Sequence, residues 1–398
     1  MLSVAEARKK ILAAASVHVS AINVKLADAQ GCVLAEDIDA AIDVPPADNS
    51  AMDGYALCIA ALQDGNKLPV AGVIYAGDPP GVLVPDTAQR IFTGAPVPRG
   101  ADAVVMQEDV VLDGQGIALK SGVTLCAGDN IRRTGEDIRC GEKLFAASHK
   151  LRARDIGLLA SVGIDHVTAF TKLRVGLLCT GDELLEPGEI VSPGKIYNSN
   201  RFLLAAMLRD LGCDVIDAGK VADDLHATQQ ALQQLAARVD VVISTGGVSV
   251  GDADYVKQAV LSLGKLDVWK IAVKPGKPLA FGTVCEKPFF GLPGNPVSAF
   301  VTFLLFVRPF LQIAQGGVEN PLRSLVVTAG FAHAVAGKRE EYLRVQLQQD
   351  SAGVLRAMAY PNQGSGVLSS VCRADALLRV PVGETFRVGD STECLLLD

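Results

Sequence analysis

The sequence predicts a multidomain α/β plus β protein, in which a central α/β domain with a mostly parallel sheet stands between β-rich regions. The length of 398 residues exceeds what one hydrophobic core holds, because domains typically span ~100–200 residues. From residue 171 onward, apolar runs alternate with helical patterns, as in strands joined by crossover helices. Before and after this region, short alternating runs separated by Gly and Pro are typical of β structure.

The N-terminal part combines helices with a β module. Residues 1–16 predict a helix, because their apolar side chains repeat on one face. Residues 44–56, VPPADNSAMDGYA, are predicted to be irregular, because two prolines and an Asp-Asn-Ser cluster interrupt regular structure. Residues 57–137 then predict an all-β module, and residues 152–163 predict a return to helix.

The central part predicts a parallel sheet covered by crossover helices. Its strands are apolar along their whole length, which fits burial on both faces of the sheet. A further helix is expected to pack on that sheet, and short β runs follow after residue 320. The expected strands are 173–181, 213–219 and 240–247, and the expected helices are 198–212, 223–239 and 297–314. Asn198 to Asn200 are candidate caps of the first of these helices and Gly212 is its stop.

The composition excludes two broad classes of protein. Hydrophobic residues make up 49% and charged residues 20%, as in ordinary globular proteins. The formal net charge of −7 argues against a general nucleic-acid binder, which would carry a basic face. The longest apolar stretch, 299–307, is far below the ~18 residues of a membrane span, and the N-terminus has charges where a signal peptide is apolar. We therefore expect a cytoplasmic protein with no nucleic-acid or membrane partner.

Cysteine and histidine patterns predict no disulfide framework and no zinc site. The nine cysteines are odd in number and contain no CxxC pair, which favours reduced and mostly buried thiols. The five histidines are isolated, without HExxH or a Cys/His metal spacing.

Carboxylates follow the ends of the three predicted central strands. Ligands of parallel α/β sheets bind at the carboxyl ends of the strands, so these loops are expected along one edge. The loops are residues 179–188, 219–226 and 244–255, and their carboxylates are Asp182, Glu183, Asp223, Asp224, Asp252 and Asp254.

The third loop, STGGVSVGDADY, has two interpretations. Gly246 and Gly247 allow the backbone to approach a ligand, and their N–H groups would form an anion-binding nest. The nearby carboxylates would then hold a divalent metal that bridges phosphates. A tight turn followed by solvated aspartates explains the spacing equally well, because neither GxGxxG nor GxxxxGK[ST] is present.

Two later loops add basic and anion-binding groups. In residues 268–282, Lys270, Lys274 and Lys277 accompany VKPGKP, whose prolines stiffen the loop and favour a phosphate clamp over a charged hairpin tip. In GLPGNPVS, Asn295 precedes a helix whose free N–H groups offer a second anion site, although simple capping explains it as well.

Seven motifs in order resemble those of the molybdopterin molybdenumtransferases, the MoeA family: PPADNSAMDGYA, FTGAPVP, RRTGED, CTGDEL, STGGVSVGDADY, VKPGKP and GLPGNPVS. The resemblance implies a discontinuous N-terminal linker region, 1–170, with a β-rich domain inserted at about 57–137. It also implies a three-layer α/β/α molybdopterin-binding domain, 171–318, and a C-terminal β-barrel domain, 319–398. A homodimer with its active site between subunits is implied too.

The implied activity is insertion of molybdate into adenylylated molybdopterin, with release of AMP and dependence on Mg²⁺. An upstream molybdopterin adenylyltransferase is the implied supplier of the substrate. This chemistry suits the residues found, because cleaving a pyrophosphate needs charge neutralisation by metal and lysine and little covalent chemistry from the protein.

The resemblance assigns roles to individual residues. The implied catalytic residues are Asp53, Thr93, Asp137, Glu183, Lys270 and Lys274. The implied metal ligands are Glu183, Asp223 and Asp254. The implied substrate-binding residues are Thr245, Gly246, Gly247, Ser249, Gly251, Lys277, Pro293, Gly294, Asn295, Arg344 and Ser365.

Two alternatives stay open. A non-catalytic carrier or scaffold would bind molybdopterin without turning it over, but it would not need the acidic and lysine set. A nucleotide-processing hydrolase of the competence-damage type would share the central domain, but it would not be expected to carry DNSAMDGYA and the β insert.

Overall fold

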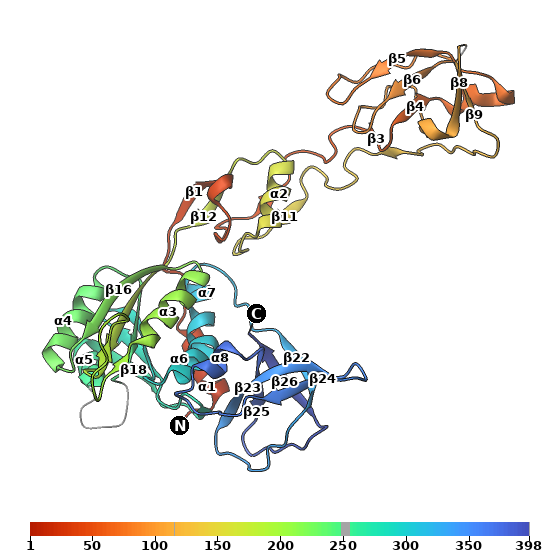
Figure 1. The fold of residues 1–398 in the computed structure, drawn as a ribbon. Helices are drawn as coiled ribbons and strands as arrows, with labels where there is room; N and C mark the ends of the chain where they lie inside the picture. The colour runs from red at the N-terminus through yellow and green to blue at the C-terminus, as the bar shows by residue number, and fades with distance from the viewer. Residues whose placement is uncertain (115, 248–254, 398) are drawn as a thin grey trace.

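The computed structural model describes residues 1–114, 116–247 and 255–397 and shows an elongated molecule (Figure 1). A small β domain lies at one end, a narrow linker follows, and an α/β domain beside a β-barrel forms the other end. This arrangement confirms the predicted fold class.

The central domain is built on a six-stranded sheet with the order β16-β13-β17-β21-β20-β18. The first four strands are parallel to one another. Strand β20 is antiparallel to β21, and β18 is antiparallel to β20. The two-residue turn between β20 and β21 has positive φ at Cys285 and Glu286, which is the geometry of a tight hairpin. The strands are β13 (Arg174–Thr180), β16 (Asp214–Val221), β17 (Val241–Thr245), β18 (Gly264–Trp269), β20 (Ala280–Val284) and β21 (Lys287–Leu292).

Helices cover both faces of this sheet and complete three layers. One face carries α1, α3 and the α6–α7 segment, and the other carries α4 and α5. The Asn198 side chain accepts the Arg201 N–H and Gly212 has φ 87°, so both predicted ends of α3 are confirmed. The helices are α1 (Val4–Ala13), α3 (Ser199–Asp210), α4 (Leu225–Ala236), α5 (Tyr255–Leu263), α6 (Pro296–Thr302), a π-helical turn (Phe303–Val307) and α7 (Arg308–Ala314).

The continuous helical segment Pro296–Ala314 is long and apolar enough to cross a membrane by length and composition alone. Its most apolar window is 72% buried within the fold, as in the core helix of a globular domain. It packs against the central sheet, where the sequence predicted it.

The chain leaves the central domain through the linker, and its returning segment pairs with the outgoing one. Strand β1 (Ala21–Lys25) pairs with β12 (His166–Phe170), and β2 (Ile38–Asp39) pairs with β11 (Lys143–Phe145). Helix α2 (Ala153–Ser161) and the 3-10 turn Leu26–Asp28 complete this segment. At its outer end the Val44 N–H donates to the Ile138 carbonyl (2.8 Å), so the outgoing and returning strands touch.

The inserted domain holds a four-stranded sheet with the order β5-β6-β4-β7. The prediction that residues 44–56 are irregular is wrong in part, because β4 begins at Gly54 and is an inner strand of this sheet. The glycine belongs there because a Cβ would stand 1.9 Å from the Val105 carbonyl oxygen of the neighbouring strand. The elements are β3 (Asn49–Ser50), β4 (Gly54–Leu57), Ile59–Gly65 (3-10), β5 (Val70–Ile74), β6 (Ala88–Ile91), β7 (Ala103–Met106), Gln107–Asp109 (3-10), β8 (Val110–Asp113), β9 (Gly116–Leu119) and β10 (Ile131–Arg132).

The C-terminal strands close into a five-stranded barrel, because β23 pairs with both β24 and β25. Strand β19 (Val273–Lys274) of the central domain joins β23 at its edge. The predicted β runs after residue 320 are confirmed, and β24 is an additional strand that the sequence did not indicate. The elements are β22 (Ser324–Ala329), β23 (Glu340–Gln349), β24 (Leu355–Ala359), α8 (Ser369–Cys372), β25 (Ala376–Val380) and β26 (Ser391–Leu396).

All nine cysteines are free thiols, but the expectation that most are buried is wrong. The exposed ones lie in turns and loops or at the end of a short helix, where no core forms around them. The buried cysteines are Cys179, Cys213 and Cys394, and the exposed ones are Cys126, Cys140, Cys285 and Cys372.

Candidate functional site

The carboxyl ends of β16, β13, β17 and β21 lie at one edge of the central sheet, because these strands are parallel neighbours. The loops after β13 and β16 are joined by two reciprocal hydrogen bonds. The Asp182 N–H donates to Asp223 Oδ2 (3.2 Å), and the Asp223 N–H donates to Asp182 Oδ1 (3.3 Å). Exposed Glu183 is in the same loop, and its carboxylate lies against Gly181. Asp182, Glu183 and Asp223 therefore lie at a common edge of the sheet, as expected from the sequence.

The loops after β17 and β21 meet through a buried threonine and asparagine. Thr245 Oγ1 donates to the Pro293 carbonyl (3.1 Å), and Asn200 Nδ2 donates to Thr245 Oγ1 (2.9 Å). The same Asn200 amide donates to the Gly294 carbonyl (2.8 Å). Asn200 was recognised in the sequence only as a candidate cap, and its bridging role depends on contacts that no local pattern reveals.

Close packing explains the two glycines of the third loop. Gly246 has φ 89°, and a Cβ there would lie 2.4 Å from the Thr180 carbonyl oxygen. Gly247 has φ 62°, and a Cβ there would lie 2.5 Å from Val256 Cγ2. The tight-turn interpretation is therefore sufficient for both glycines, and a ligand role for their N–H groups stays a prediction.

Several buried polar atoms near this edge have no hydrogen-bond partner within the described part of the chain. They include Thr180 Oγ1, Ser244 Oγ and Asn200 Oδ1. Buried polar atoms are normally paired, so unpaired ones clustered at a strand end are a feature of sites that receive a polar ligand or water.

A cavity of about 380 Å³ lies between the central domain and the barrel. Five residues that the sequence singled out line it together: Lys274, Lys277, Asn295, Arg344 and Ser365. They come from the VKPGKP loop, the start of α6, strand β23 and the loop before α8. This convergence of segments far apart in the chain is the main support for the candidate site.

Arg344 is the most deeply placed cation of this cavity. Its side chain is buried, and it donates to Ser370 Oγ (3.1 Å), the Gly364 carbonyl (3.2 Å) and the Tyr342 carbonyl (3.4 Å). All three acceptors are neutral, and burial lowers the pKa of the guanidinium. A buried charge whose acceptors in the described part of the chain are neutral favours an anionic ligand. Arg339, which the sequence did not single out, also lines the cavity.

Lys274 is held by a carboxylate from the barrel. Its Nζ lies 3.0 Å from Oε2 of Glu341, whose side chain is only 8% exposed. The parallel pairing of β19 with β23 places these two residues opposite each other. Because Lys274 is half exposed while Glu341 is buried, the pair directs the ammonium group toward the cavity.

Other predicted residues lie elsewhere. Asp53 and Thr93 are brought together, since Asp53 Oδ1 accepts the Thr93 N–H (2.8 Å) and hydroxyl (2.9 Å). They lie next to β4 and β6 of the inserted domain, which is distant from the central sheet (Figure 1). Asp137 is exposed at the outer end of the linker. Lys270 adopts φ 67° near the cavity loop but does not line the cavity.

Four residues that the sequence singled out, Ser249, Gly251, Asp252 and Asp254, lie outside the described residues. Of the expected metal ligands, only Glu183 and Asp223 can therefore be placed. Among residues 1–114, 116–247 and 255–397, no group of three or more His, Cys, Asp or Glu side chains is arranged to hold a metal ion.

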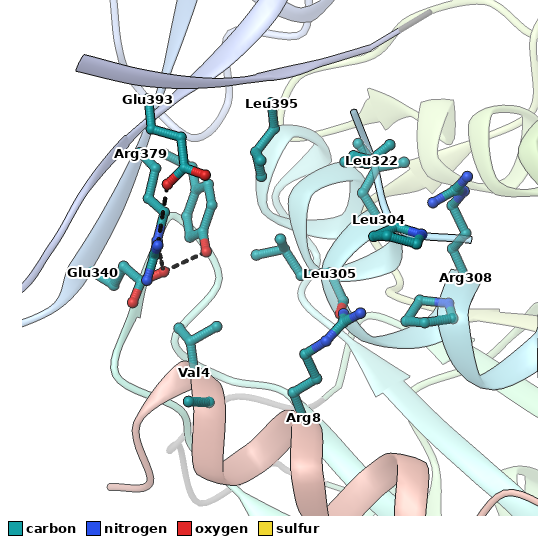
Figure 2. Close-up of a pocket in the computed structure, with 14 residues that line it drawn as sticks. Val4, Arg8, Leu304, Leu305, Arg308, Leu322, Glu340, Arg379, Glu393 and Leu395 are labelled. Atoms are coloured by element: carbon teal, nitrogen blue, oxygen red, sulfur yellow. Dashed lines mark hydrogen bonds and ion pairs between the residues drawn. The ribbon is translucent and has the colours of Figure 1, made fainter. Parts of the chain in front are cut away.

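A second cavity, of about 250 Å³, contains none of the predicted residues. Figure 2 shows it between α1, the α6–α7 segment and the barrel. Its charged groups are largely engaged, since Arg379 binds Glu340 (2.9 Å) and Glu393 (3.2 Å) and Arg8 is paired with Glu319. This cavity is therefore a packing gap with paired charges, where the helices meet the barrel.

Comparison with known proteins places the chain in a family. Family models match residues 2–163 (MoeA N-terminal region, domain I and II), 176–313 (probable molybdopterin binding domain) and 327–397 (MoeA C-terminal region, domain IV). A protein of Haemophilus influenzae named molybdopterin molybdenumtransferase is 38% identical over 98% of both chains. The chain belongs to the MoeA family.

Other MoeA family members agree with this assignment. A molybdopterin molybdenumtransferase of Nostoc is 36% identical over 90% of this chain and 84% of its own length. The crystal structure of the molybdopterin biosynthesis MoeA protein of Pyrococcus horikoshii OT3 is 29% identical, covers 100% of both chains and superposes with a TM-score of 0.84.

Proposed function

We propose that this chain is a transferase of molybdenum cofactor biosynthesis that inserts molybdate into adenylylated molybdopterin and releases AMP. Membership of the MoeA family and the names of its curated relatives support the reaction class. The observation that carries the proposal is the basic cavity beside the central sheet, lined by five residues to which the resemblance assigned catalysis or substrate binding. The proposal keeps the division into residues 1–170, 171–318 and 319–398 and a cytoplasmic location.

The cavity suits a tetrahedral oxyanion. Lys274, Lys277, Arg339 and Arg344 contribute four positive charges to its lining and Glu341 contributes one negative charge. An excess of donors with fixed positions stabilises an anion without rearrangement when charge develops on it. We assign molybdate, or the phosphate of the substrate, to this cavity.

The carboxylates at the sheet edge suit Mg²⁺. Glu183 and Asp223 are exposed and come from neighbouring loops, and carboxylate oxygens are the ligands Mg²⁺ prefers. When bound, Mg²⁺ would neutralise phosphate charge. The hydroxyl of Thr180 and the amide oxygen of Asn200, which have no partner among the described residues, fit a polar substrate group at the same edge.

The distant residues favour a composite site in a homodimer. Asp53 precedes β4 and Thr93 follows β6, and these strands stand at the far end of the elongated chain from β23, which holds Arg344 (Figure 1). If all three act on one substrate, the inserted domain of one subunit must supply the first pair to the central domain of its partner. We include this arrangement, and supply of substrate by a molybdopterin adenylyltransferase, in the proposal.

The test is AMP release by the purified protein with adenylylated molybdopterin, molybdate and Mg²⁺. We expect release that requires both molybdate and Mg²⁺, that is lost in Arg344→Ala and Lys277→Ala, and that persists in Lys9→Ala, a matched change at an exposed lysine of α1. AMP release without molybdate would indicate the hydrolase, and binding without any release would indicate the carrier. Either result refutes the proposed reaction.

A further inference from the structure

The inserted domain carries a stack of aromatic and cationic side chains that none of the roles above uses. The Tyr75 and Phe92 rings are 5.2 Å apart between centroids and within 9° of parallel. The Arg90 guanidinium lies 4.7 Å from the Phe92 ring centroid and 5.1 Å from that of Tyr55. These four side chains are called the ring platform below.

The outermost ring of the platform is open to solvent. Tyr75 is 57% exposed, although one of its faces is covered by Phe92. The platform is also held in place, because Arg90 donates to the Gly54 carbonyl (3.0 Å) and to Gln107 Oε1 (2.5 Å). A flat ligand stacking on Tyr75 would therefore meet a preorganised aromatic surface and would order few side chains.

The platform adjoins the predicted catalytic pair of the inserted domain. Thr93 follows Phe92 in the chain and donates twice to the Asp53 carboxylate. Hydrogen bonds from the Thr93 backbone and hydroxyl, with a smaller effect of the Arg90 charge, lower the pKa of Asp53. The carboxylate is therefore charged at neutral pH, and a charged carboxylate accepts hydrogen bonds from amino groups.

We propose that the ring platform binds a flat, amino-bearing nitrogen heterocycle of the substrate. Adenine and pterin, the two rings of adenylylated molybdopterin, share this chemistry, and the inference rests on the proposed function for that identity. The ring stacks on the open face of Tyr75, in the same domain as the charged Asp53 carboxylate. The inserted domain then holds a ring of the substrate while the basic cavity holds its anionic part.

The experiment uses the full-length protein and separates the two rings. Binding of AMP, of a free pterin and of inorganic pyrophosphate is measured by calorimetry for the natural protein, Tyr75→Ala, Tyr75→Phe and Val73→Ala. Val73 is exposed in β5, two residues before Tyr75, and serves as a matched control. We expect Tyr75→Ala to raise the Kd of AMP or of the pterin about tenfold, equal to about 1.4 kcal/mol, because ring stacking is lost.

The expected controls are equally specific. Tyr75→Phe and Val73→Ala keep ring binding, and pyrophosphate binding is unchanged in every variant. With the whole substrate, Tyr75→Ala raises KM about tenfold and leaves kcat within about twofold.

Two outcomes would overturn the inference. Unchanged Kd values for both AMP and the pterin in Tyr75→Ala would do so. The inference would also be overturned if Tyr75→Ala dissociated the dimer in sedimentation without changing ring binding. The ring platform would then be the contact surface for a second copy of the chain. Failure of the proposed function gives a different result from failure of this inference. In that case the natural protein would release no AMP in response to molybdate, even if ring binding depended on Tyr75.

Discussion

The ion pair between Lys274 and Glu341 leads to an asymmetric prediction for stability. Lys274→Ala leaves a carboxylate that is only 8% exposed without its cation, whereas Glu341→Gln leaves a lysine that is 51% exposed and still hydrated. Breaking a fully buried pair costs about 3–5 kcal/mol, and breaking an exposed pair costs about 0.2–1 kcal/mol. With one partner in each environment, we expect Lys274→Ala to cost about 1–2 kcal/mol and Glu341→Gln less than about 1 kcal/mol.

A double-mutant cycle measures this pair directly. The single tryptophan of the chain, Trp269, lies in β18 of the central domain, so its fluorescence in urea reports the unfolding of the domain that contains Lys274. The double variant should be no less stable than Lys274→Ala, giving a coupling energy of about 1 kcal/mol. Lys9→Ala serves as the control for the loss of an exposed lysine. A coupling below about 0.3 kcal/mol, or a larger cost for Glu341→Gln than for Lys274→Ala, would refute the reasoning.

Three further outcomes are expected. Burial raises the pKa of the Asp155 carboxyl, but hydrogen bonds from Arg152 and His149 outweigh this effect and lower the pKa overall. The stability that Asp155 contributes is therefore complete above its pKa in the unfolded chain, about 3.9, and declines as pH falls toward its lower pKa in the folded protein. The difference in stability between the natural protein and Asp155→Asn should therefore shrink between about pH 5 and 2 in acid titrations followed by circular dichroism. Gly246→Ala should destabilise the central domain by at least about 1 kcal/mol in urea, because the new methyl group meets a carbonyl oxygen at 2.4 Å; a neutral effect would contradict the packing argument. Asn198→Ala should cost about 1 kcal/mol by the same Trp269 fluorescence, and Asn198→Asp, which keeps a capping oxygen, should restore most of it.

The sequence predicted most accurately the elements whose side chains repeat regularly. Strands and helices between β13 and β17 follow from apolar runs, caps and glycine stops, and all appear near the expected bounds. Strand β4 was missed because Gly54 and the residues before it resemble a loop locally. The need for glycine there is created by a neighbouring strand some fifty residues later, which no local pattern reveals.

The candidate site could be predicted by residue but not by arrangement. Glycine-rich and lysine-rich motifs identified Lys274, Lys277 and Asn295, but their common cavity depends on how the barrel packs against the central domain. Glu341 lies in β23, which has no distinctive motif, and only the pairing of β19 with β23 reveals that it faces Lys274. Arg339 precedes that strand and is recognised only because it lines the cavity. The bridging by Asn200 likewise needs the tertiary fold.

The contact between Val44 and Ile138 has a consequence for the modularity of the molecule. The two chain crossings into the inserted domain are hydrogen-bonded neighbours, so everything between them enters and leaves through one point. A tight turn of a few residues could replace all residues between Val44 and Ile138 and leave the remaining backbone undisturbed. The shortened chain should still fold around its Trp269 core, and the excised module, joined at its own ends, should melt as a separate cooperative unit.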